Sequence, residues 1–427
     1  MAKIYLQTHG CSANFAESEM MRGMLAEAGH EIVDDIKEID NTELSIINIC
    51  TVKGDSHALK EIRRLRNKAS KVIVTGCIPK ASVDKIKHYS PVSLVNTNNI
   101  KQITLAVEKS LSGQYAEYLE RSNELKINLP KKRINPVVNI VPIASGCHSS
   151  CSFCSVKLIK GNALSYPIDK IIQDIEAGIK DSCKEVWLTS QDNSAYGLDI
   201  SKVTLLPELI KTITEIDGEF KIRIGMMSPQ HLFKVQDKFI EAIKSGKVFK
   251  FLHLPVQSGS DNVLKRMLRH YTVQEYKDFI CNIRKAIPDI TLATDMIVGF
   301  PGENEEDFNK SIELLQEIKF DIVNISRYAS REGTLAYKWK PITGDISKER
   351  SAIMTKVVDR VSLELNKRWL NWQGEIIIDE EGKDNSWVGR NYAYKPIVVK
   401  TMKELLGRTV KVKVIKAESH YLVGEMV

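Results

Sequence analysis

Short runs of β-branched residues alternate with stretches of helical spacing along most of this 427-residue chain, and this alternation limits the possible folds more than any other feature. In the first hundred residues the strand-like runs are KIYLQT (3–8), LSIINI (44–49), KVIVTG (71–76) and VSLVNT (92–97). Residues 16–28 and 58–69 have helical spacing, and Gly29 closes the first of these segments. Alternating strands and helices favour a parallel sheet with crossover connections. We therefore predict an open parallel α/β sheet domain over residues 1–112.

A second alternating series follows residues 112–136, where the periodicity fades and a linker is indicated. Its strand candidates are residues 137–143, 185–190, 221–227, 249–256, 290–298 and 322–328. Segments of helical period such as 168–180 and 276–286 lie between them. Six strand–helix units predict a partial (β/α)6 barrel of the TIM type over residues 137–365, with chemistry at the carboxyl ends of the strands.

The pattern changes again after a helical connector, and residues 366–427 show short alternating strands broken by glycine. This pattern predicts a small all-β barrel. Between Trp387 and Lys416 there are eight basic residues and one acidic residue, with Trp387, Tyr392 and Tyr394 interleaved. Because basic groups neutralise phosphates and aromatic faces stack bases, an RNA-binding surface is indicated. The alternative is an ordinary solvated face of a sheet.

Three cysteines of the first domain occupy the same topological position. Cys11 follows the first predicted strand, Cys50 ends the second and Cys77 ends the third. Ligands of open parallel sheets bind outside the carboxyl ends of the strands, so these thiols could converge. Gly10 and Gly76 precede two of them and permit unusual backbone conformations. The alternative is that the cysteines are small core residues.

Composition narrows the chemistry that these thiols can support. The sequence has no charged-then-apolar leader and no run of 18 apolar residues, so we expect a cytoplasmic protein that does not span a membrane. Eight cysteines in such a chain are too few for a disulfide scaffold and favour metal binding or catalysis. The net charge of +7 is compatible with an anionic partner.

The segment SGCHSSCSFCSVKLIKG (145–161) places Cys147, Cys151 and Cys154 within eight positions. A structural zinc site needs a fourth ligand, which His148 could provide. Iron-sulfur clusters use thiolates in short runs on a loop, and three thiolates leave one iron of a 4Fe-4S cluster open. An open metal position is typical of a catalytic site.

The array C-x-x-x-C-x-aromatic-C, with Phe153 as the aromatic residue, resembles the radical S-adenosylmethionine (SAM) superfamily. The resemblance narrows to the methylthiotransferases, on GCSAN, NICTV and TGC near the N-terminus, HLPVQSGSDNVLKRMLRHYT and DMIVGFPGENEEDF in the barrel, and SWVGRNYAYKPIVV and YLVGE near the C-terminus. It implies that SAM chelates the open iron beside Cys147, Cys151 and Cys154. It also implies a second 4Fe-4S cluster on Cys11, Cys50 and Cys77, and a TRAM domain, which is an RNA-binding β-barrel.

KLIKGNALSYP and MMSPQH resemble the archaeal and eukaryotic branch of this family, whereas Leu164 stands where many bacterial relatives have arginine. This branch acts on N6-threonylcarbamoyladenosine at position 37, next to the anticodon of tRNA. The resemblance implies that a SAM-derived deoxyadenosyl radical abstracts hydrogen from adenine C2 and that the second cluster carries the methylthio group. It also implies a tRNA anticodon stem-loop, a low-potential electron donor and a sulfur source as partners.

Three other functions stay open at this point. Two are methylthiotransferases, acting on another modified tRNA adenosine or on an aspartate of a ribosomal protein. The third is a non-catalytic iron-sulfur protein that binds RNA, against which stand the six barrel strands with polar ends. The counted basic residues of the C-terminal module favour a tRNA substrate over a protein surface.

Further polar residues follow the barrel strands and are candidates for binding. Gln191, Asp192, His253 and Gln257 could hydrogen-bond SAM or the substrate, although residues in such positions also cap helices. Asp295 and Glu303 have the same two interpretations. The candidate substrate-binding residues are Arg327, Arg331, Trp387, Arg390 and Tyr392. Cys183 and Cys281 are interpreted as structural or spare thiols.

Overall fold

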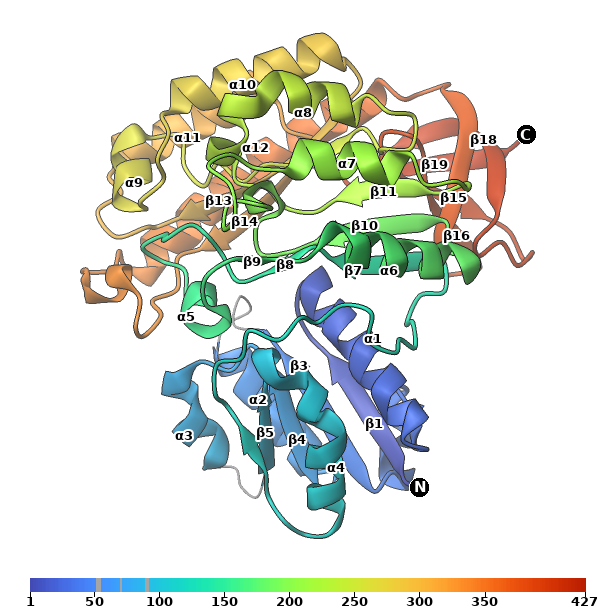
Figure 1. The fold of residues 1–427 in the computed structure, drawn as a ribbon. Helices are drawn as coiled ribbons and strands as arrows, with labels where there is room; N and C mark the ends of the chain where they lie inside the picture. The colour runs from blue at the N-terminus through green and yellow to red at the C-terminus, as the bar shows by residue number, and fades with distance from the viewer. Residues whose placement is uncertain (51–54, 70, 89–91) are drawn as a thin grey trace.

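The computed structural model describes residues 1–50, 55–69, 71–88 and 92–427. It confirms a mixed α/β architecture in which a parallel sheet domain, an open barrel and a small closed barrel follow one another in the chain. Figure 1 shows the sheet domain beneath the open barrel and the closed barrel against one end of it.

The N-terminal domain is a parallel sheet in the order β2-β1-β3-β4-β5-β6. Its strands are β1 (Lys3–Thr8), β2 (Glu31–Val33), β3 (Leu44–Ile49), β4 (Val72–Gly76), β5 (Val92–Asn96) and β6 (Glu117–Tyr118), and its helices are α1 (Ser12–Glu27), α2 (Asp55–Arg66), α3 (Val83–Lys87) and α4 (Ile103–Leu111). Every residue of β3 is buried, as expected for a central strand covered by helices on both faces.

The four predicted strands of this domain are present, and the structure adds β2 and β6 at the two edges of the sheet. Sequence patterns miss these strands because each is only two or three residues long and forms no apolar run. Strand β6 pairs with β5 beyond residue 112, so the sheet continues past the predicted end of the domain.

The central region has six parallel strands in two groups, β11-β10-β7 and β12-β13-β14. A bridge between Ile222 and Val248 links the groups into one curved surface. The strands are β7 (Val138–Pro142), β10 (Glu185–Thr189), β11 (Lys221–Ile224), β12 (Phe251–His253), β13 (Thr291–Val298) and β14 (Ile322–Arg327), and the outer helices are α6 (Ile168–Lys180), α7 (Leu206–Thr214), α8 (Gln236–Ile243), α9 (Asp261–Arg266), α10 (Val273–Ala286) and α11 (Glu305–Ile318).

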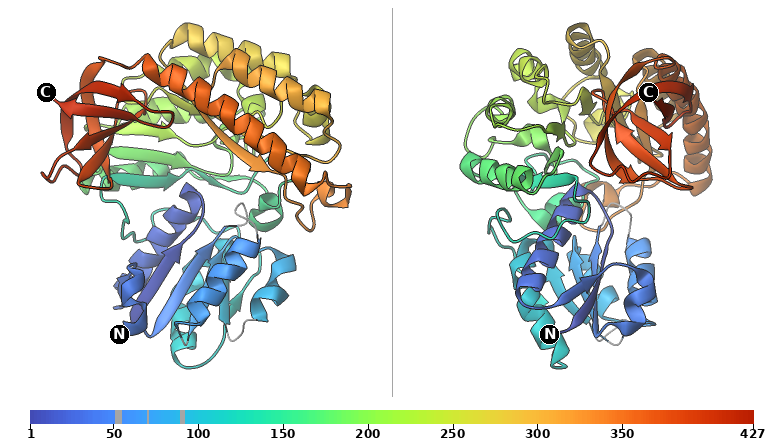
Figure 2. Two further views of the ribbon diagram at one scale, coloured as in Figure 1. Left: turned by 180° about the vertical axis from the view of Figure 1, so that it is seen from behind. Right: turned by 90° about the vertical axis from the view of Figure 1, so that its right-hand side faces the viewer.

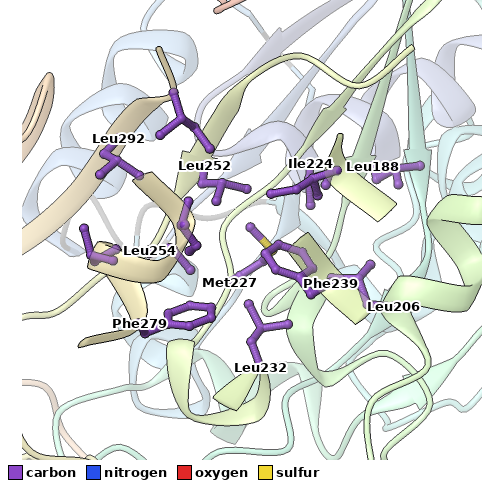
Figure 3. Close-up of a cluster of buried hydrophobic side chains, with 14 of the residues drawn as sticks. Leu188, Leu206, Ile224, Met227, Leu232, Phe239, Leu252, Leu254, Phe279 and Leu292 are labelled. Carbon is purple, nitrogen blue, oxygen red and sulfur yellow. The ribbon is translucent and has the colours of Figure 1, made fainter. Parts of the chain in front are cut away.

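The core of the open barrel lies between these strands and the helices outside them. Leu188, Ile224, Leu252 and Leu292 extend from four successive strands toward Phe239 and other helix residues (Figure 3). Capping boxes start α10 and α11, which satisfies backbone N–H groups where these helices begin. The helices therefore cover the outside of the strands and leave the carboxyl ends to the loops.

Helix α12 (Gly344–Lys367) runs along the barrel to the C-terminal module, as Figure 2 shows from behind. That module is a closed barrel of β15 (Gln373–Glu381), β16 (Ser386–Arg390), β17 (Pro396–Lys400), β19 (Leu422–Met426) and β18 (Thr409–Ala417). The Tyr394 ring lies 4.8 Å from the Phe249 ring, and Lys395 bonds to Asp321 at 2.6 Å. Because Phe249 and Asp321 precede β12 and β14, the module covers the amino ends of the strands.

The segment between the first two domains also forms specific contacts. Lys126 and Lys131, both buried at the side chain, form ion pairs with Glu17 and Asp174 respectively. These contacts attach the segment to helix α1 on one side and to helix α6 on the other. Among the helices that the structure describes, none has the length and apolar character needed to cross a membrane.

Candidate active site

The loop with Cys147, Cys151 and Cys154 lies between β8 (Ala144–Ser145) and α5 (Val156–Lys160), just past the carboxyl end of β7. The Cys147 N–H donates to the carbonyl of Gly161 at 3.2 Å, and the Cys154 N–H donates to that of Cys151 at 3.1 Å. The three thiols are half-buried and unpaired by disulfides. The loop is thus fixed by its own backbone while its sulfurs remain available.

Burial and backbone N–H donors shift the pKa of these thiols in opposite directions. Burial raises the pKa of Cys147 to about 12, opposed by an N–H from Ser149. Burial likewise raises the pKa of Cys154, opposed by N–H groups of Val156 and Lys157. Hydrogen bonds to sulfur are among the features that tune iron-sulfur clusters. Three neighbouring thiols, two of them facing backbone N–H groups, therefore fit a cluster with one open iron.

Arg269 holds the middle cysteine of this loop and was not singled out from the sequence. Its Nη1 lies 3.5 Å from the Cys151 sulfur, and its Nη2 donates to the Pro255 carbonyl at 2.9 Å. Burial lowers the pKa of Arg269, but Tyr271 and Cys151 outweigh burial and leave this pKa above its usual range. Arg269 lies in the segment LRH (268–270), but nothing in the sequence pattern indicates that its side chain reaches a cysteine about 120 residues earlier.

The second cysteine set lies at the carboxyl edge of the N-terminal sheet. Cys11 precedes α1, and Cys50 and Cys77 directly follow the adjacent strands β3 and β4. Gly10 and Gly76 have φ values of 135° and 96°, which L side chains rarely adopt. Cys50 and Cys77 are buried and Cys11 is exposed. The two residues that follow Cys50 in NICTV lie outside the described residues.

The environments of Cys11 and Cys77 differ. A hydrogen bond with Cys50 lowers the pKa of the Cys11 thiol to about 6, and the charge of Lys160 acts in the same direction. Burial raises the pKa of Cys77 to about 11. A thiol that ionises readily is a better metal ligand, so Cys11 is prepared for coordination before any metal binds.

The two cysteine sets face one another across the interface between the domains. Ser12, next to Cys11, shares a hydrogen bond of 2.6 Å with Thr189 at the carboxyl end of β10. Helix α5, which follows the Cys154 loop, receives a 3.0 Å hydrogen bond from Asn98 at the Ile159 carbonyl. Figure 1 shows α5 between the open barrel and the N-terminal domain.

A buried charge cluster lies at the same interface. Lys126 and Lys160 donate to the same Glu17 oxygen at 2.7 and 2.9 Å. Burial raises the pKa of Glu17, but the two lysines outweigh burial and bring it to about 2. Burial lowers the pKa of Lys160, but Glu17, Cys77 and Cys11 together hold it above its usual range. A pocket lined by Glu17, Lys126, Lys160 and Gln191 adjoins the cluster.

Gln191 and Asp192, two of the predicted cofactor-binding residues, follow β10. The Gln191 Oε1 is buried, accepts no hydrogen bond from the part of the chain that the structure describes, and borders the pocket just described. Asp192 caps the short helix that follows, since its Oδ1 accepts from the Ser194 N–H at 3.1 Å and the Ser228 N–H at 2.9 Å. Its Oδ2 has no hydrogen-bond partner and lies 3.6 Å from His231. Asp192 thus keeps one oxygen for other contacts.

The other two predicted cofactor-binding residues are His253, at the end of β12, and Gln257, in the loop after it. His253 Nε2 is 2.8 Å from Asp295, which also accepts from Asn324 at 2.8 Å. Burial raises the pKa of Asp295, but these hydrogen bonds hold it below its usual range. Gln257 is buried with φ at 76°, a strained conformation, and its N–H donates to the Asp295 carbonyl. The structure thus places His253, Asp295 and Gln257 together.

The predicted arginines and Glu303 differ in their surroundings. Arg327 is the last residue of β14 and is exposed. Arg331 lies close enough to Cys154 for its charge to lower the pKa of that thiol. Both therefore lie at the edge that carries the cysteine loop. Glu303 instead forms a buried ion pair with Arg350 of α12 at 2.5 Å and accepts from the Gly299 N–H. The contacts of Glu303 therefore stabilise the fold and do not indicate a ligand.

The structure corrects the expected RNA contacts of Trp387 and Arg390. Trp387 is only 8% exposed and packs in the core of the C-terminal barrel, so it presents no free face to a base. Arg390 forms a 3.0 Å ion pair with buried Asp379. Tyr392 is partly exposed, with its hydroxyl donating to Asp289 at 3.1 Å. Of the eight basic residues counted between Trp387 and Lys416, five are exposed: Lys400, Lys403, Arg408, Lys411 and Lys416.

The remaining sequence candidates have ordinary contacts. The ring of His148, considered as a zinc ligand, packs edge-on against His231 with 5.7 Å between centroids. Within the described ranges, no three His, Cys, Asp or Glu side chains gather closely enough for a single metal ion. The Cys183 thiol donates to the Pro136 carbonyl at 3.3 Å, and Cys281 is exposed.

Comparison with known families agrees with this division of the chain. Residues 3–96 match the uncharacterized protein family UPF0004, residues 141–315 match the radical SAM superfamily and residues 374–427 match the TRAM domain. The open barrel with a three-cysteine loop after its first strand therefore defines a radical SAM enzyme, a class that uses an iron-sulfur cluster and SAM.

Comparison with full-length relatives identifies the family within the radical SAM enzymes. The chain is 39% identical over 432 residues to a probable threonylcarbamoyladenosine tRNA methylthiotransferase of Pyrococcus horikoshii, covering 100% of both chains. It is 31% identical over 436 residues to the human threonylcarbamoyladenosine tRNA methylthiotransferase, covering 100% of this chain and 74% of that one. The chain belongs to the threonylcarbamoyladenosine tRNA methylthiotransferase family.

Solved structures share the fold at low identity. The radical SAM methyltransferase TsrM from Kitasatospora setae, with cobalamin and a 4Fe-4S cluster bound, matches with a TM-score of 0.56 and 12% identity, over 76% of this chain and 74% of that chain. The cobalamin-dependent radical SAM enzyme OxsB matches in its apo form with a TM-score of 0.51 and 13% identity, over 90% and 63%. Both likenesses concern the fold alone.

Proposed function

We propose that this protein is a tRNA methylthiotransferase that inserts a methylthio group at C2 of N6-threonylcarbamoyladenosine at position 37, next to the anticodon. The family relationship supports the nucleoside, since full-length relatives carry this activity in their names. The observation that carries the mechanism is the 2.6 Å contact between Ser12 and Thr189, which brings the two cysteine sets to facing surfaces. Sulfur insertion needs a radical source and a sulfur carrier close together.

In this proposal Cys147, Cys151 and Cys154 hold one 4Fe-4S cluster, and Cys11, Cys50 and Cys77 hold a second. When bound, the first supplies a SAM-derived radical able to abstract hydrogen from an unactivated C–H bond, and the second supplies the sulfur group. The protein orients these groups: Arg269 fixes the Cys151 sulfur, and the His253–Asp295 pair presents an oriented imidazole at the carboxyl edge of the barrel.

Gln191, Asp192, His253 and Gln257 are the proposed contacts for SAM or the substrate, in particular through Gln191 Oε1 and Asp192 Oδ2, which accept no hydrogen bond from the described residues. Arg327 and Arg331 are the proposed contacts for a phosphate or carboxylate group of the substrate. Exposed basic residues of the C-terminal barrel would bind the tRNA backbone at the opposite end of the strands. An extended partner such as an anticodon stem-loop suits two contact regions separated in this way.

The proposal also includes a low-potential electron donor, a sulfur source and a cytoplasmic location. Its domains are an N-terminal methylthiotransferase domain over residues 1–112, a radical SAM domain over 137–365 and a TRAM domain over 366–427. The test is mass spectrometry of nucleosides from tRNA incubated anaerobically with reconstituted protein, SAM, sulfide as the sulfur source and dithionite. We expect a mass gain of one methylthio group on threonylcarbamoyladenosine. No gain with both clusters loaded would refute the function.

A further inference from the structure

Residues 331–340 form an ordered turn after strand β14, which we call the basic turn. The Thr334 N–H and hydroxyl both donate to the Arg331 carbonyl, at 3.2 and 2.7 Å. The Trp339 N–H donates to the Ala336 carbonyl at 3.1 Å. Figure 1 shows this segment in orange, extending from the open barrel on the side of helix α5. Its conformation is therefore held by hydrogen bonds within the turn itself.

Ala336 anchors the basic turn to the cysteine loop of the barrel. Its N–H donates to the Ser152 carbonyl at 2.8 Å, and Ser152 directly follows Cys151. The Ala336 side chain is fully buried in a cluster with Phe300, against which Phe153 of the cysteine loop also packs. A ligand bound on this turn is therefore held next to the loop that carries the three cysteines of the barrel.

The two neighbours of Ala336 are large apolar side chains that the fold leaves in solvent. Leu335 is 46% exposed and Tyr337 is 50% exposed. Leu158 of α5 is 48% exposed and lies beside the turn, because a Cβ atom at Gly333 would be 3.1 Å from the Leu158 Cδ1. An ordered turn that presents large apolar side chains to solvent, instead of burying them, is typical of a binding surface.

The charges of the basic turn indicate the chemistry of its partner. The turn contains three basic residues and one acidic residue, which are Arg331, Lys338, Lys340 and Glu332. Lys338 and Lys340 are exposed, and Arg327 is exposed at the end of β14, just before the turn. Basic side chains beside an exposed aromatic ring suit a single-stranded nucleic acid, because its phosphates bind cations and its unpaired bases stack on aromatic faces.

We propose that the basic turn binds the unpaired loop of the tRNA substrate, with Tyr337 stacking on a base next to the target nucleoside and Lys338 and Lys340 binding the adjoining phosphates. The inference rests on the proposed function, which supplies an anticodon loop as the substrate. Stacking on a tyrosine ring holds an unpaired strand without reading its sequence. Because Ala336 is bonded to Ser152, the stacked base takes a fixed place relative to the cysteine loop.

The experiment measures the binding of two RNAs to the full reconstituted chain by fluorescence anisotropy. One RNA is a synthetic anticodon stem-loop, and the other is a duplex of the same stem without the loop. Tyr337→Ala, Tyr337→Leu and Tyr337→Phe are compared, and Lys338→Ala and Lys340→Ala are measured over a salt series. Tyr115→Ala is the matched control, since Tyr115 is 58% exposed in the segment that leads from α4 into the amino end of β6.

We expect Tyr337→Ala and Tyr337→Leu to weaken stem-loop binding about tenfold, whereas Tyr337→Phe should bind like the parent because it keeps the aromatic face. None of the three should change duplex binding, since paired bases offer no free face. Lys338→Ala and Lys340→Ala should weaken the binding of both RNAs and each reduce the slope of log affinity against log salt by about one. Tyr115→Ala should bind both RNAs like the parent.

Equal stem-loop affinities of the parent and Tyr337→Ala would overturn the inference, and so would a loss in Tyr337→Phe as large as that in Tyr337→Leu. A turn that docks a protein would give another result: Tyr337→Ala would slow cluster reduction by a small acidic flavoprotein but not by dithionite, with stem-loop affinity unchanged. That result would also overturn the inference. If Tyr337→Ala loses iron, the comparison of Tyr337→Leu with Tyr337→Phe decides. The proposed function fails in a different way, because the parent itself would then form no methylthio product.

Discussion

The hydroxyl groups of Ser12 and Thr189 lie 2.6 Å apart and join the start of helix α1 to the end of strand β10. Ser12 follows Cys11 directly, and Gln191 lies two residues beyond Thr189. One hydrogen bond between domains therefore sets the position of an N-terminal thiol relative to the polar edge of the barrel. In the proposed reaction, this position determines whether sulfur and radical reach the same base.

Replacing Thr189 with valine tests this contact. Thr189→Val keeps the shape of the side chain and removes the hydroxyl, so it should cost about 1 kcal/mol of stability. Methylthio transfer should fall by at least about tenfold, because a small misplacement of reacting groups costs more than the bond itself. Thr212→Val is the control for urea melts and product assays, since the Thr212 hydroxyl donates to the Glu208 carbonyl on the exposed side of α7. Equal activity in both variants would contradict the role given to this contact.

Iron content tests the assignment of the two cysteine sets. About eight irons per chain are expected after anaerobic reconstitution, from two clusters of four. The triple change of Cys147, Cys151 and Cys154 to alanine should halve this number, and so should the triple change of Cys11, Cys50 and Cys77. The double change of Cys183 and Cys281 to alanine should leave it unchanged. Full iron in either triple variant would exclude that set as the ligands.

Arg269→Lys tests the support of the Cys151 sulfur. Lysine keeps the positive charge but cannot bridge the sulfur and the Pro255 carbonyl as the guanidinium does. We expect iron to leave the radical SAM loop several-fold faster when a chelator is added, measured by the loss of absorbance. Arg266→Lys, three residues earlier and hydrogen-bonded to Pro301, is the control. Identical release rates would show that Arg269 does not hold the cluster.

The interface of the two barrels should respond to pH through Glu185. Burial, followed by the charge of Asp379, raises the pKa of Glu185 to about 8. An acid with a raised pKa binds its proton more tightly in the folded protein, so its contribution to stability is complete below pH 4.5 and decreases up to about pH 8. Glu185→Gln should remove this dependence, so its free energy of unfolding should gain about 3 to 4 kcal/mol relative to the parent between pH 5 and 8. If urea melts give a constant difference in the free energy of unfolding between parent and variant across this pH range, the raised pKa of Glu185 is contradicted.

Exposed and buried basic residues of the C-terminal barrel should behave differently toward tRNA. Lys400→Ala and Lys411→Ala should each weaken binding and reduce the slope of log affinity against log salt by about one. Arg390→Met should instead lower the melting temperature, because it leaves Asp379 buried without its partner. Fluorescence anisotropy over a salt series, with thermal melts in parallel, separates the two effects. An unchanged slope for both lysine variants would place the RNA surface elsewhere.

Sequence patterns predicted the central elements of the fold and missed its margins. Strands such as β3 and β13 are visible because their burial favours runs rich in apolar and β-branched residues. Strands β2 and β6 are only three and two residues long, and their pairing comes from the neighbouring strand rather than from their own composition. The segment predicted as a linker likewise contains Lys126 and Lys131, whose burial depends on partners far along the chain.

The residues of the candidate site also fall into two groups, those that sequence patterns could indicate and those that they could not. Six cysteines, Gln191 and His253 could be selected because they lie near the carboxyl ends of predicted strands. Arg269, Lys160 and Glu17 could not, since each lies in a helix or turn and finds its partner more than a hundred residues away. Trp387 and Arg390 were assigned to RNA by composition, yet both contribute to packing within the C-terminal module and against the barrel.

By itself the sequence determined the order of domains, the carboxyl-end position of both cysteine sets and the family. These follow from local periodicity and short motifs, in which neighbours along the chain are neighbours in space. Only the tertiary structure decided that the two sets face each other, that Lys160 reaches from one domain into the other, and that the C-terminal barrel covers the amino ends of the strands. These relationships depend on docking between domains, which is governed by buried contacts distant in sequence and leaves no periodic pattern.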